Sequence, residues 1–192
     1  MHNLIIFASG RGSNAQAIID YFGESDETRV ALIVTNKADA GVIDVAKKEN
    51  IPFIVASRAE MAGDEFLSEL ISYKPSLVIL AGFLLKIPNS LIDAFPNKII
   101  NIHPALLPGY GGKGMWGHHV HSAVINSGDK QSGISIHAVD EVYDHGAVIL
   151  QARCPVLPGD TPETLAARIH KLEHYYFPRT IEFLLNNEGQ YV

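Results

Sequence analysis

An asparagine and a histidine lie close together where an apolar run of the sequence ends. The run "KIINIH", residues 98–103, carries Asn101 and His103, and Pro104 follows at once. Side chains two positions apart in a strand point to the same side, so we expect both to face one cleft. An amide and an imidazole together can donate hydrogen bonds to an oxygen that gains negative charge, and the imidazole can also move a proton. The pair is a candidate catalytic site.

A histidine at a strand end is often only structural, and this chain contains nine histidines. His137 fits a structural role as well as a functional one. Asp144, in the predicted turn "EVYDHG", supplies a carboxylate two residues before Gly146, which permits close approach. Beside His103 this carboxylate would favour the imidazolium, raise the histidine pKa and allow proton donation near neutral pH. Asp140 and Glu141 are rival acids, and a solvated acidic turn is the structural alternative.

The segment "GRGSN", residues 10–14, joins a predicted strand to a predicted helix. The backbone N–H groups of Gly12, Ser13 and Asn14 would lie at the helix start, where the helix dipole favours an anion. The Gly-x-Gly-x-x-Ala pattern also fits a loose dinucleotide fingerprint, but the second strand ends in "VTNK" without the acid that holds a ribose. The Lys-Ser/Thr of a P-loop is absent too. A phosphomonoester site is favoured over a turn merely capped by Ser13.

Other residues that bind metals or act as nucleophiles give weaker signals. His118 and His121 could share a helix face, with His119 between them, but no cysteine or nearby carboxylate completes a ligand set. We therefore expect no metal and a solvated helix start. Cys154 is expected to pack as a small apolar side chain. As the single cysteine it permits no internal disulfide, which fits a reducing compartment and a cytoplasmic location.

Length and composition indicate an ordinary globular protein. The 192 residues suit one domain, with 47% hydrophobic and 19% charged residues. The net charge of −6 disfavours a general nucleic-acid binder, which needs a surplus of lysine and arginine. No apolar run reaches the roughly 18 residues that suggest a membrane span. The N-terminus lacks a basic region and leads directly into the glycine loop, so we expect a first strand rather than a signal peptide.

Short apolar runs alternate with longer amphipathic ones in the first half of the chain. The runs are apolar on both faces, which is typical of parallel strands covered by helices on each side. Strand, helix and strand at this rhythm predict βαβ units with right-handed crossovers. Strands are expected at residues 4–9, 29–36, 52–57, 76–82 and 98–103, and helices at residues 15–22, 39–50 and 64–73.

The second half has a different pattern. A helix is expected at residues 118–128, and strands at 133–141 and 147–156 are too close together for a crossover, so they should pair antiparallel. A last helix should start with Thr161 as its N-cap, and Pro178 should kink or interrupt it. The predicted fold is a single-domain, doubly wound (Rossmann-like) α/β sheet, mostly parallel, with an antiparallel hairpin at the C-terminal end.

Several motifs occur together in one order and cover nearly the whole chain. They resemble the folate-dependent phosphoribosylglycinamide formyltransferase family of purine biosynthesis. The resemblance implies one formyltransferase domain over residues 1–192, in which residues of about 1–100 bind the phosphate and ribonucleotide and the rest complete the folate and catalytic site. The motifs are "SGRGSNAQAII", "TNKADAG", "VILAGFLLKIP", "NIHPALLPGYGG", "GISIHAVDEVYDHGAVILQ" and "LEHYYFP".

The resemblance implies transfer of a formyl group from 10-formyltetrahydrofolate, as co-substrate, to the amine of glycinamide ribonucleotide, without a metal. The family's catalytic trio corresponds to Asn101, His103 and Asp144. The ribonucleotide site corresponds to Gly12, Ser13, Asn14 and Glu173. The folate site corresponds to Leu84, Leu85, Lys86, Ile87, Asn101, Asp140, Glu141 and Asp144. Partners implied are these two small molecules, with no nucleic acid or membrane, and the chain is expected to be a monomer or a homodimer.

This sequence departs from the family pattern in the folate region. Many members have a Met-Arg pair where this chain has Leu84 and Leu85, so folate contacts should fall largely to backbone groups. Arg58 is a candidate for the family's folate-contacting arginine. The stretch "GYGGKGMWGHHVH", residues 109–121, is longer than in some members, and no role is assigned to it.

Three other functions are alternatives to this prediction. Formyltetrahydrofolate deformylase uses water as the nucleophile, but it carries an additional N-terminal domain and would give the "GRGSN" loop no purpose. Methionyl-tRNA formyltransferase carries an additional C-terminal domain and needs affinity for tRNA, which the acidic composition disfavours. A non-catalytic nucleotide- or folate-binding module is the alternative from another class, and an activity assay separates it from the enzymes.

Overall fold

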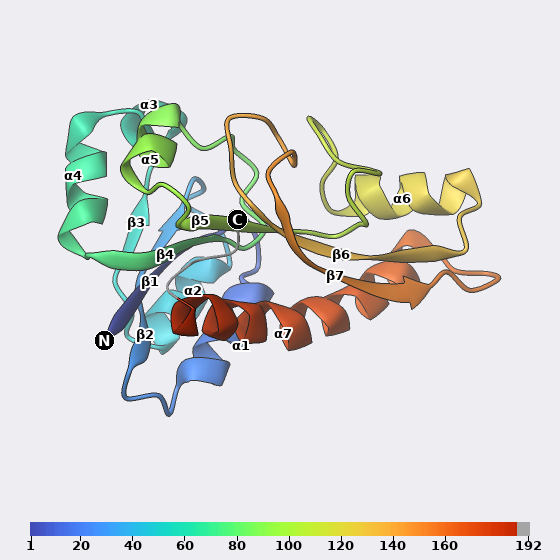
Figure 1. The fold of residues 1–192 in the computed structure, drawn as a ribbon, viewed down its shortest axis with the longest axis horizontal. Coiled ribbons are helices and arrows are strands. Elements are labelled where there is room, and N and C mark those ends of the chain that lie inside the picture. Colours follow the sequence, from blue (N-terminus) through green and yellow to red (C-terminus); the bar gives the residue numbers. More distant parts are fainter. Residues whose placement is uncertain (188–192) are drawn as a thin grey trace.

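A single sheet of seven strands, in the order β3-β2-β1-β4-β5-β6-β7, organises the protein (Figure 1). The computed structural model describes residues 1–187. Strands β1 to β5 run parallel, whereas β5–β6 and β6–β7 pair antiparallel, which confirms the predicted fold class. The strands are β1 (His2–Phe7), β2 (Thr28–Thr35), β3 (Phe53–Val55), β4 (Pro75–Leu80), β5 (Ile99–His103), β6 (Gln131–Ala138) and β7 (Val148–Pro155).

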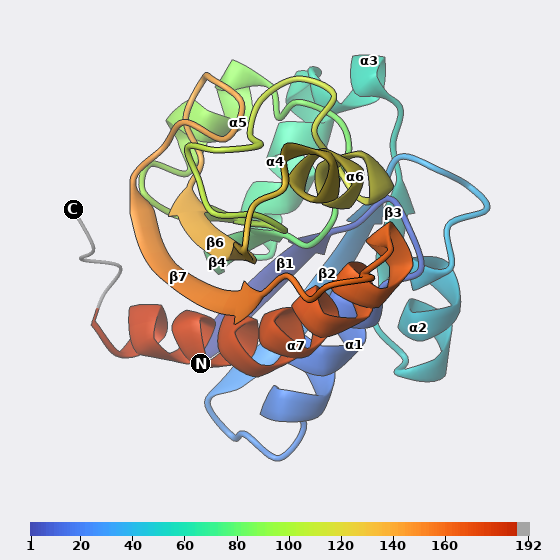
Figure 2. The ribbon, with the colours of Figure 1, turned by 90° about the vertical axis from the view of Figure 1, so that its right-hand side faces the viewer.

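Helices cover both faces of this sheet. Residues of α1, α2 and α7 pack into one buried cluster and residues of α3, α4 and α5 into a second, on opposite sides of the sheet (Figure 1). Figure 2 shows α7 lying beside α1, with α6 facing the viewer above α7. The helices are α1 (Ser13–Phe22), α2 (Val42–Lys48), α3 (Arg58–Met61), α4 (Asp64–Ser72), α5 (Asn89–Ala94), α6 (His118–Ser127) and α7 (Pro162–Asn186).

The alternation of side chains explains why the first strand is apolar throughout. Leu4 and Ile6 belong to one core cluster, while Ile5 and Phe7 belong to the other. All four side chains are fully buried. A strand that points alternately into two cores needs apolar residues at every position, which is the pattern of a parallel sheet covered on both faces.

Two expectations about helices need correction. Helix α7 continues for 25 residues through Pro178, so the predicted interruption is wrong. Pro178 and its neighbour Phe177 are buried, and this packing outweighs the loss of one helical hydrogen bond. Helices α3 and α5 were not expected because four and six residues are too few to show a helical period. The predicted N-cap of α7 is confirmed, since the Thr161 side chain accepts a hydrogen bond from the Thr164 backbone N–H.

The register of the sheet determines which polar residues meet. Strands β1, β4 and β5 are parallel, so the segments that follow them leave the sheet at one edge. Strand β6 runs antiparallel to β5 and places His137 opposite Asn101 and Ser135 opposite His103. The sheet therefore brings three segments into one region: the loop after β1, the end of β5, and the hairpin where β6 leads into its turn.

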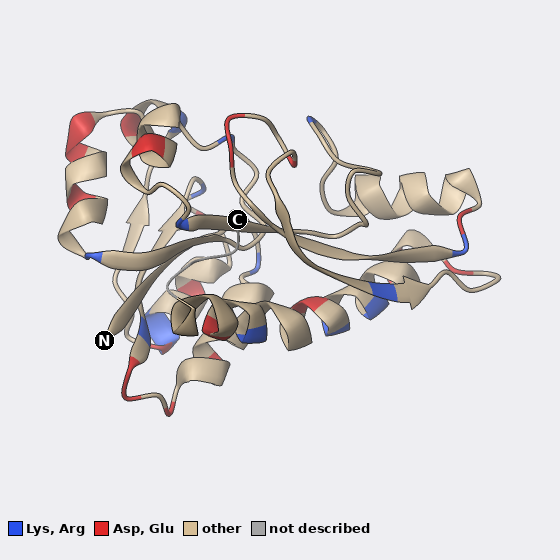
Figure 3. Ribbon diagram, viewed as in Figure 1, with Lys and Arg blue, Asp and Glu red and all other residues tan. Residues whose placement is uncertain are grey.

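Charges are distributed over many elements. In Figure 3, lysine and arginine lie scattered among helices, strands and loops, and acidic residues accompany them. Among the helices within residues 1–187, none combines the length and the apolar character needed to cross a bilayer.

The hairpin supplies a test of the fold. A Cβ at Gly133 would lie 2.0 Å from the carbonyl oxygen of Ala152 on β7. Because the backbone must move, we expect Gly133→Ala to lower the free energy of unfolding by about 3 kcal/mol. The neighbouring Ser132→Ala is the control, since its buried hydroxyl finds no hydrogen-bond partner in the described chain, and a change within about 0.5 kcal/mol is expected. Urea unfolding measures both, and equal stability of the two variants would contradict the packing.

Candidate active site

A cavity of about 660 Å³ opens where these segments meet. It is lined by the glycine loop, by the segment after β4, by the end of β5, by the turn of the hairpin and by α7. It brings together nearly all residues expected from the sequence. These are Gly12, Ser13, Asn14, Leu84, Leu85, Lys86, Ile87, Asn101, His103, Asp140, Asp144 and Glu173. Glu141 is exposed and is not part of this lining, nor is Arg58, which lies in α3.

The glycine loop closes directly onto α2. Gly12 adopts a φ of 80° and forms the N-cap of α1. A Cβ there would lie 2.9 Å from the Cα of Val42, so both the backbone angle and the space require glycine. Ser13 begins α1 and makes no side-chain cap, which argues against the reading of the loop as a merely capped turn. Gly12, Ser13 and Asn14 present the N-terminus of α1 to the cavity, where an anion is favoured.

A hydrogen bond joins this loop to the last helix. The Nδ2 group of Asn14 donates to Oε2 of Glu173 over 3.0 Å, although the residues are 159 positions apart. Glu173 is 5% exposed and lines the cavity. A buried carboxylate held by an amide beside an anion site is suited to accept hydrogen bonds from the hydroxyl groups of a bound ligand.

His103 is held by two contacts. Its Nε2 lies 2.8 Å from the carbonyl oxygen of Tyr110, and its Nδ1 lies 3.6 Å from Oδ2 of Asp144. Because a carbonyl only accepts, Nε2 carries the hydrogen, and Nδ1 faces the carboxylate. Burial lowers the pKa of His103 below its ordinary value, although Asp144 and the Tyr110 carbonyl both act to raise it. The predicted neighbour is in place, but the predicted rise of the pKa is wrong because desolvation outweighs the charge.

Asp144 is the centre of the polar cluster. Its Oδ2 accepts a hydrogen bond of 2.9 Å from the Gly112 N–H, and its Oδ1 lies 3.5 Å from Nδ2 of Asn101. Burial alone would raise the pKa of Asp144, but the contact with His137, the charge of His103 and the Gly112 N–H together lower it below its usual range. The side chain therefore remains a carboxylate at neutral pH.

A tight turn presents this carboxylate to the cluster. The backbone of Asp144 itself has a φ of 53°. A Cβ at Gly146 would lie 2.0 Å from the Ala138 carbonyl oxygen, so the glycine permits the close approach that the sequence suggested.

His137 belongs to the cluster as well. The side chain is buried, its Nδ1 lies 2.8 Å from the Ala138 carbonyl and its Nε2 lies 3.0 Å from Nδ2 of Asn101. The carbonyl fixes the hydrogen on Nδ1, so Nε2 accepts from the Asn101 amide and orients it. Sequence reasoning left the role of His137 open, and only the pairing of β5 with β6 identifies its place.

Comparison with known proteins agrees with this geometry. The model of the Formyl transferase family matches residues 2–181. This chain belongs to the formyl transferase family. It is 38% identical over 198 residues to phosphoribosylglycinamide formyltransferase of Bacillus subtilis, which covers 99% of both chains. The chloroplastic phosphoribosylglycinamide formyltransferase of Arabidopsis thaliana is 42% identical over 187 residues and 93% of this chain, which spans only 63% of that relative's length.

A solved structure supports the fold of this formyl transferase. Glycinamide ribonucleotide transformylase 1 of Geobacillus kaustophilus superposes with a TM-score of 0.87 at 38% identity. The match covers 96% of this chain and 99% of the other. The resemblance deduced from the motifs is confirmed at the level of the family.

The histidines of α6 differ from the expectation for this formyl transferase. His118 and His119 are exposed, as predicted, but His121 is only 3% exposed and lines the cavity. The prediction of a solvated position is therefore wrong for His121, because this residue lies on the buried face of α6, with Val120 and Val124. Burial lowers the pKa of His121 to about 4, and the neighbouring His170 and His118 act in the same direction. Within residues 1–187, no three potential ligand side chains gather as a metal site.

The pKa of His121 predicts how stability depends on pH. In the unfolded chain the imidazole titrates near 6.5, whereas in the folded chain it titrates near 4. Between these values the unfolded state binds more protons, so acidification from about pH 6.5 to pH 4 lowers stability. We expect His121→Gln to lose less unfolding free energy than the wild type between pH 7 and pH 5 in urea titrations. The exposed His119→Gln is the control, and a wild-type pH dependence in His121→Gln would contradict the assignment.

Proposed function

We propose that this protein transfers the formyl group of 10-formyltetrahydrofolate to the amine of glycinamide ribonucleotide. The observation that carries the proposal is one cavity lined by both an anion-binding helix terminus and the cluster of Asn101, His103 and Asp144. The names of the Bacillus and Arabidopsis relatives support the same reaction. The single buried Cys154 supports a cytoplasmic location as part of this proposal.

The ribonucleotide occupies the side of the cavity formed by α1 and α7. Its phosphate binds the N–H groups at residues 12–14, where the helix dipole adds to the hydrogen bonds. Glu173, which is oriented by Asn14, accepts hydrogen bonds from the ribose hydroxyls. This arrangement directs the substrate amine towards the end of β5.

The folate occupies the side formed by residues 84–87 and the turn at Asp140 and Asp144. Leu84 and Leu85 supply apolar wall here, so polar recognition falls to backbone groups. The N–H of Leu84 already donates to the Ser9 hydroxyl over 2.9 Å, which leaves the backbone groups of the following residues for the pterin. Glu141 lies outside the lining, and its side chain has no place in the proposed contacts.

The reaction then follows from the polar cluster. The substrate amine attacks the formyl carbon, a C–N bond forms, and the carbonyl oxygen becomes negative. Asn101 donates to this oxygen, since its contact of 3.5 Å with Asp144 is long enough to be exchanged. His103 accepts the amine proton on Nδ1 and delivers it to the folate nitrogen as the bond between that nitrogen and the formyl carbon breaks. Asp144 stabilises the imidazolium that exists between these steps.

Replacement of His103 tests the proton transfer. We expect His103→Ala to reduce turnover about 10²- to 10⁴-fold, the usual contribution of a positioned acid–base group. The assay follows folate release from 10-formyltetrahydrofolate with and without glycinamide ribonucleotide. Release only with the ribonucleotide supports transfer, release without it indicates a deformylase, and no release indicates a binding module. Near-wild-type turnover of His103→Ala would exclude the proposed role.

Gly12 tests the phosphate site. Ala at this position would meet Val42 and would have to adopt a φ of 80°, so the N–H groups of the loop must shift. Hydrogen bonds to a charged group contribute about 1.5–3 kcal/mol, so Gly12→Ala should raise KM for the ribonucleotide about 10- to 100-fold. Gly23→Ala, at the other end of α1 with a φ of −59°, is the matched control. A KM that is unchanged in Gly12→Ala would place the phosphate elsewhere.

A further inference from the structure

A short loop segment touches both His103 and Asp144. The carbonyl of Tyr110 accepts from His103 Nε2, and the N–H of Gly112 donates to Asp144. Gly111 lies between them, and a Cβ there would come within 3.2 Å of the Asp144 Cβ. The position of residues 110–112 thus affects the orientation of both side chains.

The backbone conformation of residues 110–112 is not one that the segment would favour by itself. Tyr110 has a φ of 58°, a left-handed conformation that is unfavourable for a residue with a side chain. Its neighbours on both sides are glycines, which leave the unfolded backbone with many alternatives. A contact outside the segment must therefore stabilise the observed conformation.

Besides the contacts with His103 and Asp144, the side chain of Tyr110 makes such a contact, and its ring packs against the core. Its hydroxyl donates to the carboxylate of Asp129 and lies 2.6 Å from the Ser127 hydroxyl. Ser127 is the last residue of α6, and its own hydroxyl donates to the Val124 carbonyl over 2.8 Å. Val124 is fully buried in the core. The loop is thereby tied to a regular element whose position the core fixes.

We propose that the Tyr110 hydroxyl, through Asp129, is a positioning group that fixes the tautomer and orientation of His103. When the Tyr110 hydroxyl holds the loop, the Tyr110 carbonyl accepts a hydrogen bond from Nε2 of His103. The other ring nitrogen, Nδ1, then carries no hydrogen and faces Asp144. Without the anchor the carbonyl can move away, and the imidazole can place its hydrogen on Nδ1. The catalytic meaning of this inference rests on the proposed function, whereas the tautomer itself can be measured without any reaction.

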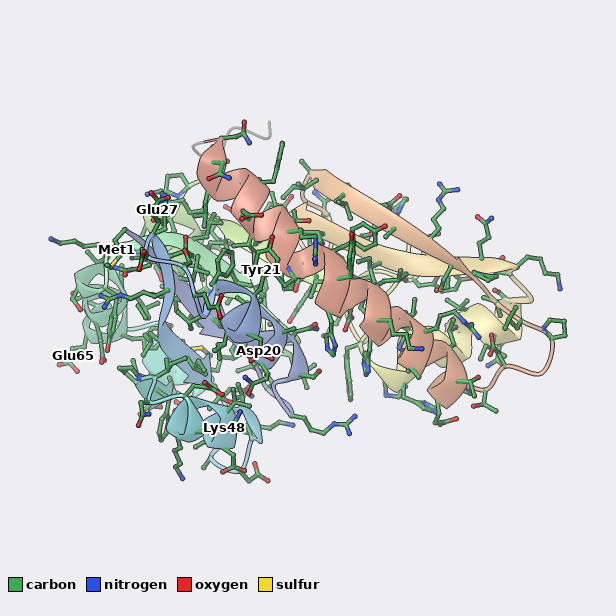
Figure 4. All side chains as sticks on the ribbon, turned by 90° about the horizontal axis from the view of Figure 1, so that it is seen from below. Met1, Asp20, Tyr21, Glu27, Lys48 and Glu65 are labelled. Atoms are coloured by element: carbon green, nitrogen blue, oxygen red, sulfur yellow. The ribbon has the colours of Figure 1, made fainter. Side chains whose placement is uncertain are left out.

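The molecule contains a matched control pair. The hydroxyl of Tyr21 on α1 donates to Glu182 on α7 over 2.6 Å, on the helix-covered face where Figure 4 labels Tyr21. Tyr21→Phe removes a tyrosine–carboxylate contact of the same kind that does not involve the cavity lining. We expect Tyr110→Phe and Asp129→Asn to reduce kcat about 10- to 100-fold with little change in KM, and Tyr21→Phe to leave kcat unchanged. The double variant Tyr110→Phe with Asp129→Asn should be no worse than either single variant.

The decisive readout is the imidazole nitrogen spectrum of His103. In the ligand-free wild type we expect the Nε2–H tautomer, and in Tyr110→Phe and Asp129→Asn a mixture with Nδ1–H. Circular dichroism and thermal unfolding identify any variant that does not fold, and the second variant then carries the test. An unchanged tautomer in the folded variants would overturn the inference, whether or not kcat falls. Absence of formyl transfer in the wild type would refute the proposed function and leave this spectral test intact.

Discussion

The site depends on the contacts of the Asp144 carboxylate, whose side chain is 11% exposed. The carboxylate contacts Asn101 and His103 from β5 and His137 from β6. It also contacts the backbone N–H of Gly112, in the loop at residues 110–112. A charge removed from water is tolerated when hydrogen-bond donors contact it, and here the Asn101 amide and the Gly112 N–H are those donors. The strand register places Asn101 and the two imidazoles beside the carboxylate, and the loop at residues 110–112 supplies the Gly112 N–H. Removal of the carboxylate would leave all four groups without their common partner.

Burial also determines the protonation of His103. Desolvation disfavours the imidazolium, and the nearby carboxylate favours it, so the two effects oppose each other. Desolvation prevails, which leaves a neutral imidazole whose Nδ1 carries no hydrogen. Such a group is ready to take a proton, and Asp144 makes the charged form accessible during the reaction. A fully solvated histidine would titrate close to its ordinary pKa, because neither desolvation nor a neighbouring carboxylate would act strongly on it.

Local patterns in the sequence were sufficient for part of this account. Strand alternation gave the common side of Asn101 and His103, and the motifs gave the family. Contacts between distant segments could not be derived in the same way. The place of His137 depends on pairing of β6 with β5, and the burial of His121 depends on packing of α6. The lowered pKa of His103 required the degree of burial, which no spacing of residues reveals.

Asp144 opposes the effect of burial on the protonation of His103. Titration of the His103 ring signals by nuclear magnetic resonance, in the wild type and in Asp144→Asn, measures this directly. Asparagine preserves the shape and tolerates the left-handed backbone of this position. We expect a wild-type pKa below the ordinary value and a still lower pKa in Asp144→Asn, because the favourable charge is lost. An unchanged or higher pKa in the variant would contradict it.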